Sequence, residues 1–130
     1  MTFRVGEAQN LPFEDDSVPL LTSLNAPEHF GLGRYGDPID PYGPERAFAE
    51  FRRVVRPGGW ILLCVPVHYK PILVFNLMRA FSVEQVRSYF EGYPIVTEQF
   101  LDAKQGPIPQ PEPYFREREV YYAVAFEKPA

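Results

Sequence analysis

Apolar runs alternate with polar stretches rich in glycine and proline along this chain, and the pattern predicts an α/β domain. Val18 to Ser23 and Trp60 to Val67 are short apolar runs typical of buried strands. The second is expected to be a central strand covered on both faces. Between the two runs, apolar residues recur at helical spacing after Pro44 until Pro57-Gly58-Gly59 ends the helix. This spacing leaves Glu50, Arg52 and Arg53 to solvent. The central part of the chain is therefore expected to be strand, helix, strand.

The C-terminal half is predicted to add a second helix and two further strands. Ser82 to Gln85 has the form of a capping box, so a short helix is expected from there to Glu91, with Gly92 as its terminator. Ile95 to Leu101 and Val120 to Phe126 have the composition of strands. We expect these two strands to form an antiparallel hairpin with a long connection.

Two other segments complete the predicted domain. Thr2 to Val5 is expected to be a short strand closed by Gly6. Between Gly106 and Pro113, prolines alternate with other residues, which favours a stiff connection between two strands; a ligand for an aromatic groove is the alternative. No internal repeat or long linker divides the 130 residues, so a single domain is expected.

The polar stretch from Glu28 to Pro41 is the best candidate for chemistry. Its three glycines and two prolines exclude helix and strand, so an ordered loop is expected. The loop follows an apolar strand, and open α/β sheets bind their ligands in loops at strand ends. The side chains in it that can ionise or hydrogen-bond are Glu28, His29, Arg34, Tyr35, Asp37 and Asp40.

Composition removes several classes of function. The net charge of -4, the pI near 5.2 and the lack of a basic stripe argue against a nucleic-acid partner. No signal peptide is recognisable, and no apolar segment approaches the ~20 residues that span a bilayer, so a cytoplasmic protein without membrane contact is expected. The single cysteine, Cys64, is expected to be a buried core residue.

Several passages resemble the C-terminal half of a class I S-adenosylmethionine-dependent methyltransferase. Val5 to Phe13 resembles the stretch after the third strand of that fold, Ser17 to Ser23 its fourth strand, and Phe51 to Leu62 the helix, Pro-Gly-Gly turn and fifth strand. The resemblance implies an α/β fold with a truncated Rossmann-like sheet of strands 3 to 7, flanking helices and a C-terminal antiparallel hairpin. It also implies that Glu7 and Ala8 lie beside the adenine of S-adenosylmethionine.

The loop from Glu28 to Pro41 resembles more narrowly an uncharacterised methyltransferase-like family, known as a domain of unknown function, whose members contain this loop almost verbatim. Phe75 to Arg79 is similar to a Phe-Asn-x-x-Arg element of that family, although Met78 stands where the family usually has histidine. The resemblance implies positions on the acceptor side of the site, with catalytic roles for Glu28, His29, Arg34 and Tyr35 and substrate-side roles for Asp37, Asp40, Asn76 and Arg79.

Two features of the methyltransferase superfamily have no counterpart in this sequence. These are the glycine-rich loop after the first strand and the acidic residue that ends the second. A single partial domain that lacks the cofactor-binding half, with doubtful binding of S-adenosylmethionine by itself, is therefore expected. In the family sheet order 3-2-1-4-5-7-6, the Val18–Ser23 strand becomes an unpaired edge. We expect a homodimer, formed through this edge or by exchange of the N-terminal strand.

Each candidate side chain also has a purely structural interpretation. Glu28 and His29 can act as general acid and base. The alternative is a loop organised by hydrogen bonds among His29, Arg34, Asp37 and Asp40. Arg34 and Arg79 can bind an anionic substrate group, but internal salt bridges are favoured. Glu28, His29, Asp37 and Asp40 offer oxygen and imidazole ligands that suit a divalent metal. The spacing of these residues is not diagnostic of a metal site, so no metal is predicted.

Two hypotheses for the function therefore remain open. The first is methyl transfer from S-adenosylmethionine to an unknown small-molecule acceptor, with this isolated chain inactive. The second is a non-catalytic homodimeric binding module derived from a methyltransferase. The two differ in whether the chain binds the cofactor.

Overall fold

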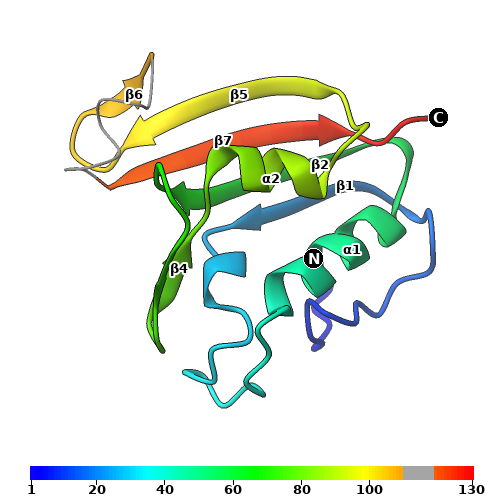
Figure 1. Ribbon diagram of the computed structural model, residues 1–130. Helices are drawn as coiled ribbons and strands as arrows, with labels where there is room; N and C mark the ends of the chain where they lie inside the picture. Colours follow the sequence, from blue (N-terminus) through cyan, green and yellow to red (C-terminus); the bar gives the residue numbers. More distant parts are fainter. Residues whose placement is uncertain (110–118) are drawn as a thin grey trace.

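The computed structural model describes residues 1–109 and 119–130, and its centre is a five-stranded mixed sheet (Figure 1). The strand order is β1-β2-β7-β5-β6. In that order the strands are β1 (Val18–Leu24), β2 (Val55–Val67), β7 (Val120–Glu127), β5 (Ile95–Asp102) and β6 (Gly106–Ile108). The remaining elements are the 3-10 turn η1 (Pro27–His29), helices α1 (Gly43–Val54) and α2 (Val83–Tyr89), and the hairpin of β3 (Ile72–Val74) and β4 (Met78–Ala80).

The pairing of the strands confirms the predicted α/β fold. β1 and β2 are parallel and are connected through α1, whereas β7 is antiparallel to both β2 and β5. The predicted antiparallel pairing of the two C-terminal strands is thus confirmed, with Thr97 opposite Ala125 through Asp102 opposite Val120 and a register shift between Ile95 and Thr97. In the described sheet β1 is an edge, as expected for Val18–Ser23. It is not the buried strand that its apolar run predicted, because an edge with one open face leaves Leu20 and Leu24 exposed and only Ser23 buried.

The hydrophobic core lies between one face of the sheet and the two helices. Ile61, Leu63 and Val65 of β2 are fully buried there, together with alternate residues of β7. Phe48 of α1 lies at the centre of this layer and is 0% exposed. Its ring lies 4.9–6.0 Å, between centroids, from the rings of Phe51, Phe81, Tyr89 and Phe90. Apolar spacing on α1 and alternation on β2 both place their side chains in this layer.

The opposite face of the sheet is more open, which corrects the expectation that β2 is covered on both faces. Trp60 is 45% exposed, and Leu62 and Cys64 are half-buried. These side chains point away from the helices, because both helices pack on the same face. Cys64 therefore lies outside the buried core, contrary to prediction, although burial still raises the pKa of its thiol.

The N-terminal segment corrects another prediction, since Thr2 to Val5 does not form a strand. Met1, Phe3 and Val5 are highly exposed, and the first bridge in the chain joins Glu7 to Asn10. An isolated extended segment gains little without a neighbouring strand to satisfy its N–H and C=O groups. No described strand pairs with residues 2–5.

The second helix is close to its prediction, with one difference in the capping box. The hydroxyl of Ser82 accepts a hydrogen bond from the Gln85 N–H (3.0 Å), as expected of the cap. The Gln85 side chain does not return this bond, because its Nε2 donates instead to the Tyr89 hydroxyl (2.9 Å). The helix ends at Tyr89, and Gly92 follows with a left-handed φ of 84°.

Two short elements were not predicted. The β3–β4 hairpin occupies residues 72–80, and β6 pairs with the end of β5 where only a stiff connection between two strands was expected. Pro107 lies within β6, while Pro111 and Pro113 of the alternating series lie outside the described residues.

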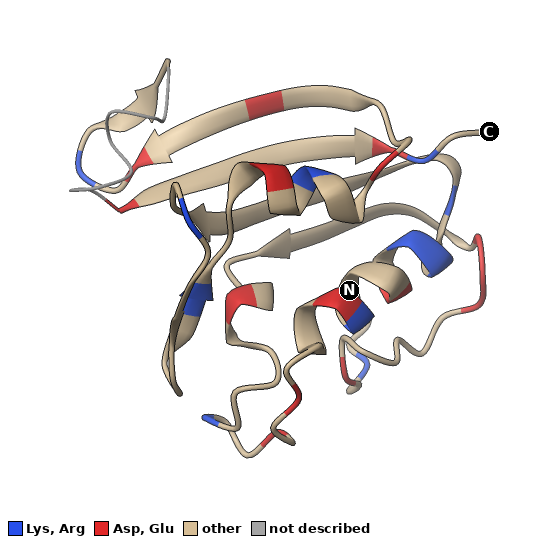
Figure 2. Cartoon of the chain, viewed as in Figure 1, with Lys and Arg blue, Asp and Glu red and all other residues tan. Residues whose placement is uncertain are grey.

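Charged residues are interspersed over the described chain, and Figure 2 shows no basic stripe along any element there. In residues 1–109 and 119–130, neither helix has the length and hydropathy that crossing a membrane requires.

Candidate functional site

A cavity of about 520 Å³ opens beyond the carboxyl end of β1. One wall is the segment Gly6–Gln9, and the other is formed by residues 25–38. The structure therefore brings together the segment predicted to face adenine and the loop predicted to face the acceptor. The predicted site residues that line this cavity are Glu7, Ala8, His29, Tyr35 and Asp37.

Asp37 organises the tip of the loop. Its carboxylate accepts hydrogen bonds from the backbone N–H groups of Gly31 (3.1 Å), Gly33 (3.4 Å) and Tyr35 (3.3 Å). Burial by itself would raise the pKa of Asp37, but these hydrogen bonds outweigh it and hold the pKa below its usual value. Asp37 thus lines the cavity mainly as a structural anion, and its oxygens are already engaged by the loop.

Asp40 ties the end of the loop to α1. The Gly31 carbonyl accepts a hydrogen bond from the Asp40 N–H (2.8 Å), and Asp40 Oδ1 accepts one from the Tyr42 N–H (2.9 Å). Its other oxygen forms an ion pair with Arg46 Nε at 3.0 Å. Hydrogen bonds do organise the loop, but not the predicted ones among His29, Arg34, Asp37 and Asp40. Asp37 and Asp40 instead bind backbone N–H groups, and Asp40 also binds Arg46.

His29 is held in a defined tautomer. Its Nδ1 lies 2.9 Å from the Leu77 carbonyl oxygen, which can only accept, so Nδ1 carries the proton that is donated. In the neutral ring, Nε2 then keeps its lone pair, and it lies 3.8 Å from Glu28 Oε1. The ring also meets Tyr35 edge-on, with centroids 5.9 Å apart. The arrangement leaves one ring nitrogen able to accept a proton.

Glu28 is an unusual carboxylate because it is buried without enough partners. The residue is 3% exposed, and its Oε2 has no hydrogen-bond partner among the described residues. Burial raises the pKa of Glu28 above its usual value, and the opposing effects of a backbone hydrogen bond and of His29 are smaller. A buried polar group left unpaired costs stability, which is the pattern expected at a functional position.

Other predicted residues lie away from this cavity. Arg34 is exposed, and Asn76 is exposed in the turn between β3 and β4. Arg79 donates a hydrogen bond to the Phe30 carbonyl oxygen from the far side of the loop and lines a second cavity with Glu45. Within residues 1–109 and 119–130, neither Arg34 nor Arg79 forms the salt bridge that the sequence favoured.

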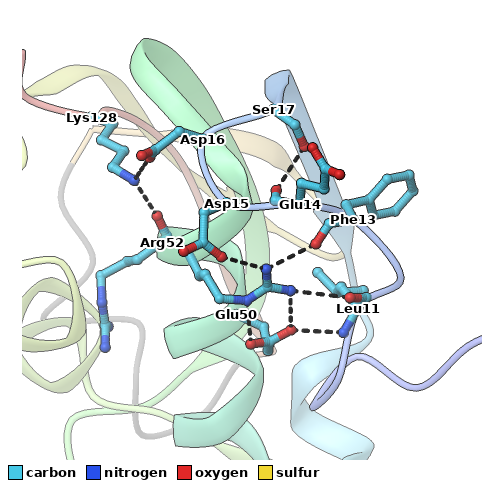
Figure 3. A network of polar contacts seen from close by, with 10 residues as sticks. Leu11, Phe13, Glu14, Asp15, Asp16, Ser17, Glu50, Arg52 and Lys128 are labelled. Atoms are coloured by element: carbon cyan, nitrogen blue, oxygen red, sulfur yellow. Dashed lines mark hydrogen bonds and ion pairs between the residues drawn. The ribbon is translucent and has the colours of Figure 1, made fainter.

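A polar network that the sequence did not predict fixes the segment after the first wall of the cavity (Figure 3). Arg53 donates hydrogen bonds to both oxygens of Glu50, to Asp15 and to the carbonyl oxygens of Leu11 and Phe13. Glu50 Oε2 in turn accepts from the Leu11 N–H at 2.7 Å. The network raises the pKa of Arg53 and lowers that of Glu50, chiefly through their mutual hydrogen bonds.

The sequence interpretation left Glu50 and Arg53 to solvent, and this was wrong. Both lie on the polar face of α1, as the helical spacing predicted, but residues 11–17 run along that face and cover it. The spacing of Glu50 and Arg53, three residues apart, indicated an ion pair. Nothing local in the sequence indicated which backbone carbonyls Arg53 would bind.

The family comparison matches most of the chain. Residues 8–111 match the model of a family described as Caenorhabditis protein of unknown function, DUF268. No curated protein is similar enough in sequence to count as a relative.

Solved structures resemble this chain in fold. A SAM-dependent methyltransferase from Methanosarcina mazei is 14% identical with a TM-score of 0.68. The match covers 98% of this chain and 66% of the Methanosarcina protein. A putative methyltransferase from Bacillus halodurans is 16% identical with a TM-score of 0.69. The match covers 96% of this chain and 70% of the Bacillus protein. The [4+2]-cyclase SpnF is 17% identical with a TM-score of 0.66. The match covers 98% of this chain and 57% of SpnF.

These likenesses show the fold, which is the Rossmann-like fold of methyltransferases. The chain spans 57% of SpnF and 66% of the Methanosarcina protein, so less than two thirds of either. A cyclase stands among the similar structures beside methyltransferases. The fold alone therefore does not fix the reaction.

Proposed function

We propose that this chain, which belongs to the family described as Caenorhabditis protein of unknown function, DUF268, forms the adenine-facing and acceptor-facing walls of an S-adenosylmethionine-dependent methyltransferase site. The observation that supports this most directly is the cavity of about 520 Å³, which is lined both by Glu7 and Ala8 and by His29 and Tyr35. Cavities of this size suit small-molecule ligands. The likeness in fold to SAM-dependent methyltransferases is the reason for proposing S-adenosylmethionine as the cofactor.

The residues present fit such a ligand. Glu7 supplies an exposed carboxylate that can accept hydrogen bonds, and Ala8 leaves room for a flat ring beside the backbone. When bound, S-adenosylmethionine supplies an activated methyl group on sulfur. Glu7 and Ala8 would hold its adenosine part, and the opposite wall would orient the acceptor.

His29 has the clearest chemical role in this proposal. Because Nδ1–H is engaged by the Leu77 carbonyl, Nε2 is the atom that takes up the proton released by an acceptor hydroxyl or amine. Glu28 Oε1 lies 3.8 Å from Nε2, on the side of the ring opposite the Leu77 contact at Nδ1. Tyr35 limits where the acceptor can approach, since its ring meets the edge of His29. We assign Glu28 a positioning role, because it is buried behind His29.

Titration of the ¹⁵N-labelled chain with S-adenosylhomocysteine tests this proposal. This ligand lacks the methyl group that would be transferred, so binding is observed without reaction. We expect saturable shifts of backbone amide resonances that centre on residues 6–9 and 25–38. Ala8→Trp fills the cavity and should weaken binding roughly tenfold or more, a loss of about 1.4 kcal/mol.

Ala103→Trp is the matched control, because Ala103 is exposed in the turn between β5 and β6 and lies far from the cavity in the sequence and the sheet. This variant should bind as the wild type does. Shifts centred elsewhere, an unchanged affinity in Ala8→Trp, or no shift up to about 5 mM ligand would contradict the proposed site.

A second candidate function is association with another copy of the chain through β1. β1 pairs with β2 on one side, and its other edge is open in the described sheet. Leu20 is 54% and Leu24 is 63% exposed on this strand, beside the exposed Trp60. An open edge with apolar side chains favours pairing, and two copies of one strand can pair antiparallel about a twofold axis.

Multi-angle light scattering tests this candidate by measuring the mass of the chain in solution. We expect the wild-type chain to have the mass of a dimer at micromolar concentration and the double variant Leu20→Lys, Leu24→Lys to be monomeric, since charges on the edge disfavour pairing. Ile39→Lys changes an equally exposed residue in the loop and should stay dimeric. A wild-type chain that is monomeric throughout this range would remove the candidate.

A further inference from the structure

The β3–β4 hairpin contains the densest group of exposed apolar side chains in the part of the chain that the structure describes. Within residues 72–77, which we call the hairpin tip, five large apolar side chains are each at least 39% exposed: Ile72, Leu73, Val74, Phe75 and Leu77. Phe75, in the turn between the two strands, is the most exposed of them at 64%. The tip extends away from the five-stranded sheet (Figure 1). Contiguous exposed apolar patches mark interaction surfaces.

The backbone of the tip finds its hydrogen bonds within the protein. β3 and β4 pair along their whole length, and the Leu77 N–H donates to the Val74 carbonyl oxygen (2.7 Å) to close the turn. The Leu77 carbonyl oxygen accepts the hydrogen bond from His29 Nδ1. Unpaired backbone groups are the main obstacle to placing a chain in an apolar medium. The tip therefore presents chiefly hydrocarbon to whatever covers it.

The base of the hairpin is fixed to the end of β2. The His68 N–H donates to the Phe81 carbonyl oxygen (2.8 Å), and the Phe81 N–H donates to the Pro66 carbonyl oxygen (3.1 Å). Arg79 also ties β4 to the neighbouring loop through the Phe30 carbonyl oxygen. These contacts hold the hairpin in a defined direction, so that its tip projects as a wedge.

The hairpin lies in a stretch without acidic residues, although the chain has a net charge of -4. No Asp or Glu occurs between Glu50 and Glu84, whereas Lys70 precedes the tip and Arg79 follows it. Lys70 is exposed, and its Nζ lies 5.7 Å from the centroid of the Tyr69 ring, which is 45% exposed. The base of the wedge is thus aromatic and basic.

Carboxylates of the neighbouring elements do not reverse this sign. Glu28 of η1, which contacts β4, is buried. Glu45 of α1 accepts a hydrogen bond from the Tyr89 hydroxyl, and Asp40 forms an ion pair with Arg46. Residues 34–46 and 66–83 together contain four basic and three acidic residues, whereas acidic residues outnumber basic ones by 17 to 13 in the whole chain. This end of the molecule is therefore complementary to an anionic surface.

We propose that the hairpin tip inserts into the surface of an anionic lipid bilayer, with Tyr69 and Lys70 at the level of the head groups. Aromatic rings and lysines are favoured at that level, and aliphatic and phenylalanine side chains are favoured below it. A projecting tip also fits a deformable surface better than a rigid one. The sequence argued against membrane contact because no segment could span a bilayer, but insertion at the surface needs no spanning segment.

Tryptophan fluorescence tests the insertion directly. Trp60, the single tryptophan of the chain, lies in the first half of β2, whereas the hairpin follows the end of that strand. The double variant Phe75→Trp, Trp60→Phe moves the indole to the tip. We expect vesicles of phosphatidylcholine with about 20% phosphatidylserine to shift its emission saturably to shorter wavelength. The emission of Trp60 in the wild-type chain should not shift.

Cosedimentation with the same vesicles measures what each side chain contributes. Phe75→Ser should weaken binding roughly tenfold, because the ring no longer leaves water. Lys70→Gln should weaken it roughly fivefold, and only when phosphatidylserine is present. Ile95→Ser is the matched control, since Ile95 is 41% exposed at the start of β5, and this variant should bind as the wild type does. Val74→Ser replaces Phe75→Ser if that variant fails to fold.

No sedimentation of the wild-type chain with the vesicles would overturn the proposal. Unchanged binding in a folded Phe75→Ser or Val74→Ser variant would do the same, and equal binding to pure phosphatidylcholine would contradict an anionic surface. An emission shift that follows protein concentration and ignores vesicles would assign the tip to a second copy of the chain instead. None of these outcomes bears on the larger cavity, which is tested with S-adenosylhomocysteine.

Discussion

Gly31→Ala is expected to destabilise the protein by more than about 2 kcal/mol and to disorder the wall of the larger cavity. Gly31 has a φ of 76°, and a left-handed conformation costs other residues roughly 1–2 kcal/mol. A Cβ atom added there would also lie 1.9 Å from the Asp40 backbone oxygen, a contact that requires the loop to move. Moving Gly31 would break its hydrogen bond to Asp37, which holds the tip of the loop.

Gly36→Ala is the matched control for this prediction. Gly36 has a φ of 82°, but no heavy atom lies within 4 Å of an added Cβ. Its cost should therefore be limited to the backbone conformation, about 1–2 kcal/mol. Urea denaturation of both variants measures the difference. Equal losses of stability would show that the close approach of Gly31 to Asp40 does not constrain the loop.

Phe48→Ala is expected to lower the free energy of unfolding by about 3–5 kcal/mol. The ring is fully buried and contacts aromatic side chains from α1, α2 and the segments that flank α2. Its removal leaves a cavity where the two helices meet the sheet. Because domains have only about 5–15 kcal/mol of stability in total, the variant should be marginally folded.

Phe13→Ala provides the comparison, since Phe13 is 41% exposed in the segment that precedes β1. Its loss should cost much less, on the order of 1 kcal/mol, because less apolar surface returns to water. Chemical denaturation monitored by circular dichroism gives both values. A cost for Phe48→Ala as small as that for Phe13→Ala would mean that the core does not depend on this ring.

The elements with strong local signals were predictable. β1, α1, β5 and β7 occur close to their expected positions, because apolar periodicity and Pro44 act over a few residues. The Pro57-Gly58-Gly59 stretch predicted to end the helix lies instead inside β2, three residues after α1 ends at Val54. The antiparallel order of the last two strands also followed from the pattern. Thr2–Val5 failed as a strand because β propensity depends on a partner, and no described strand pairs with it.

The candidate site was predictable in part. The Glu28–Pro41 loop stood out by its polar residues, and Glu7 and Ala8 entered through the resemblance to methyltransferases. Their meeting at one cavity could not be derived from local spacing, since residues 6–9 and 25–38 are brought together by contacts with α1 and β2.

The sequence by itself determined an acidic α/β chain with a polar loop after an apolar strand, because these features depend on composition and on periodicity within single elements. The tertiary structure decided which polar groups are engaged and which are left unpaired. Asp37 became a structural anion, Arg53 bound a neighbouring segment, and Glu28 was buried beside His29. Desolvation and hydrogen bonding depend on groups distant in the chain, so only the folded arrangement fixes them.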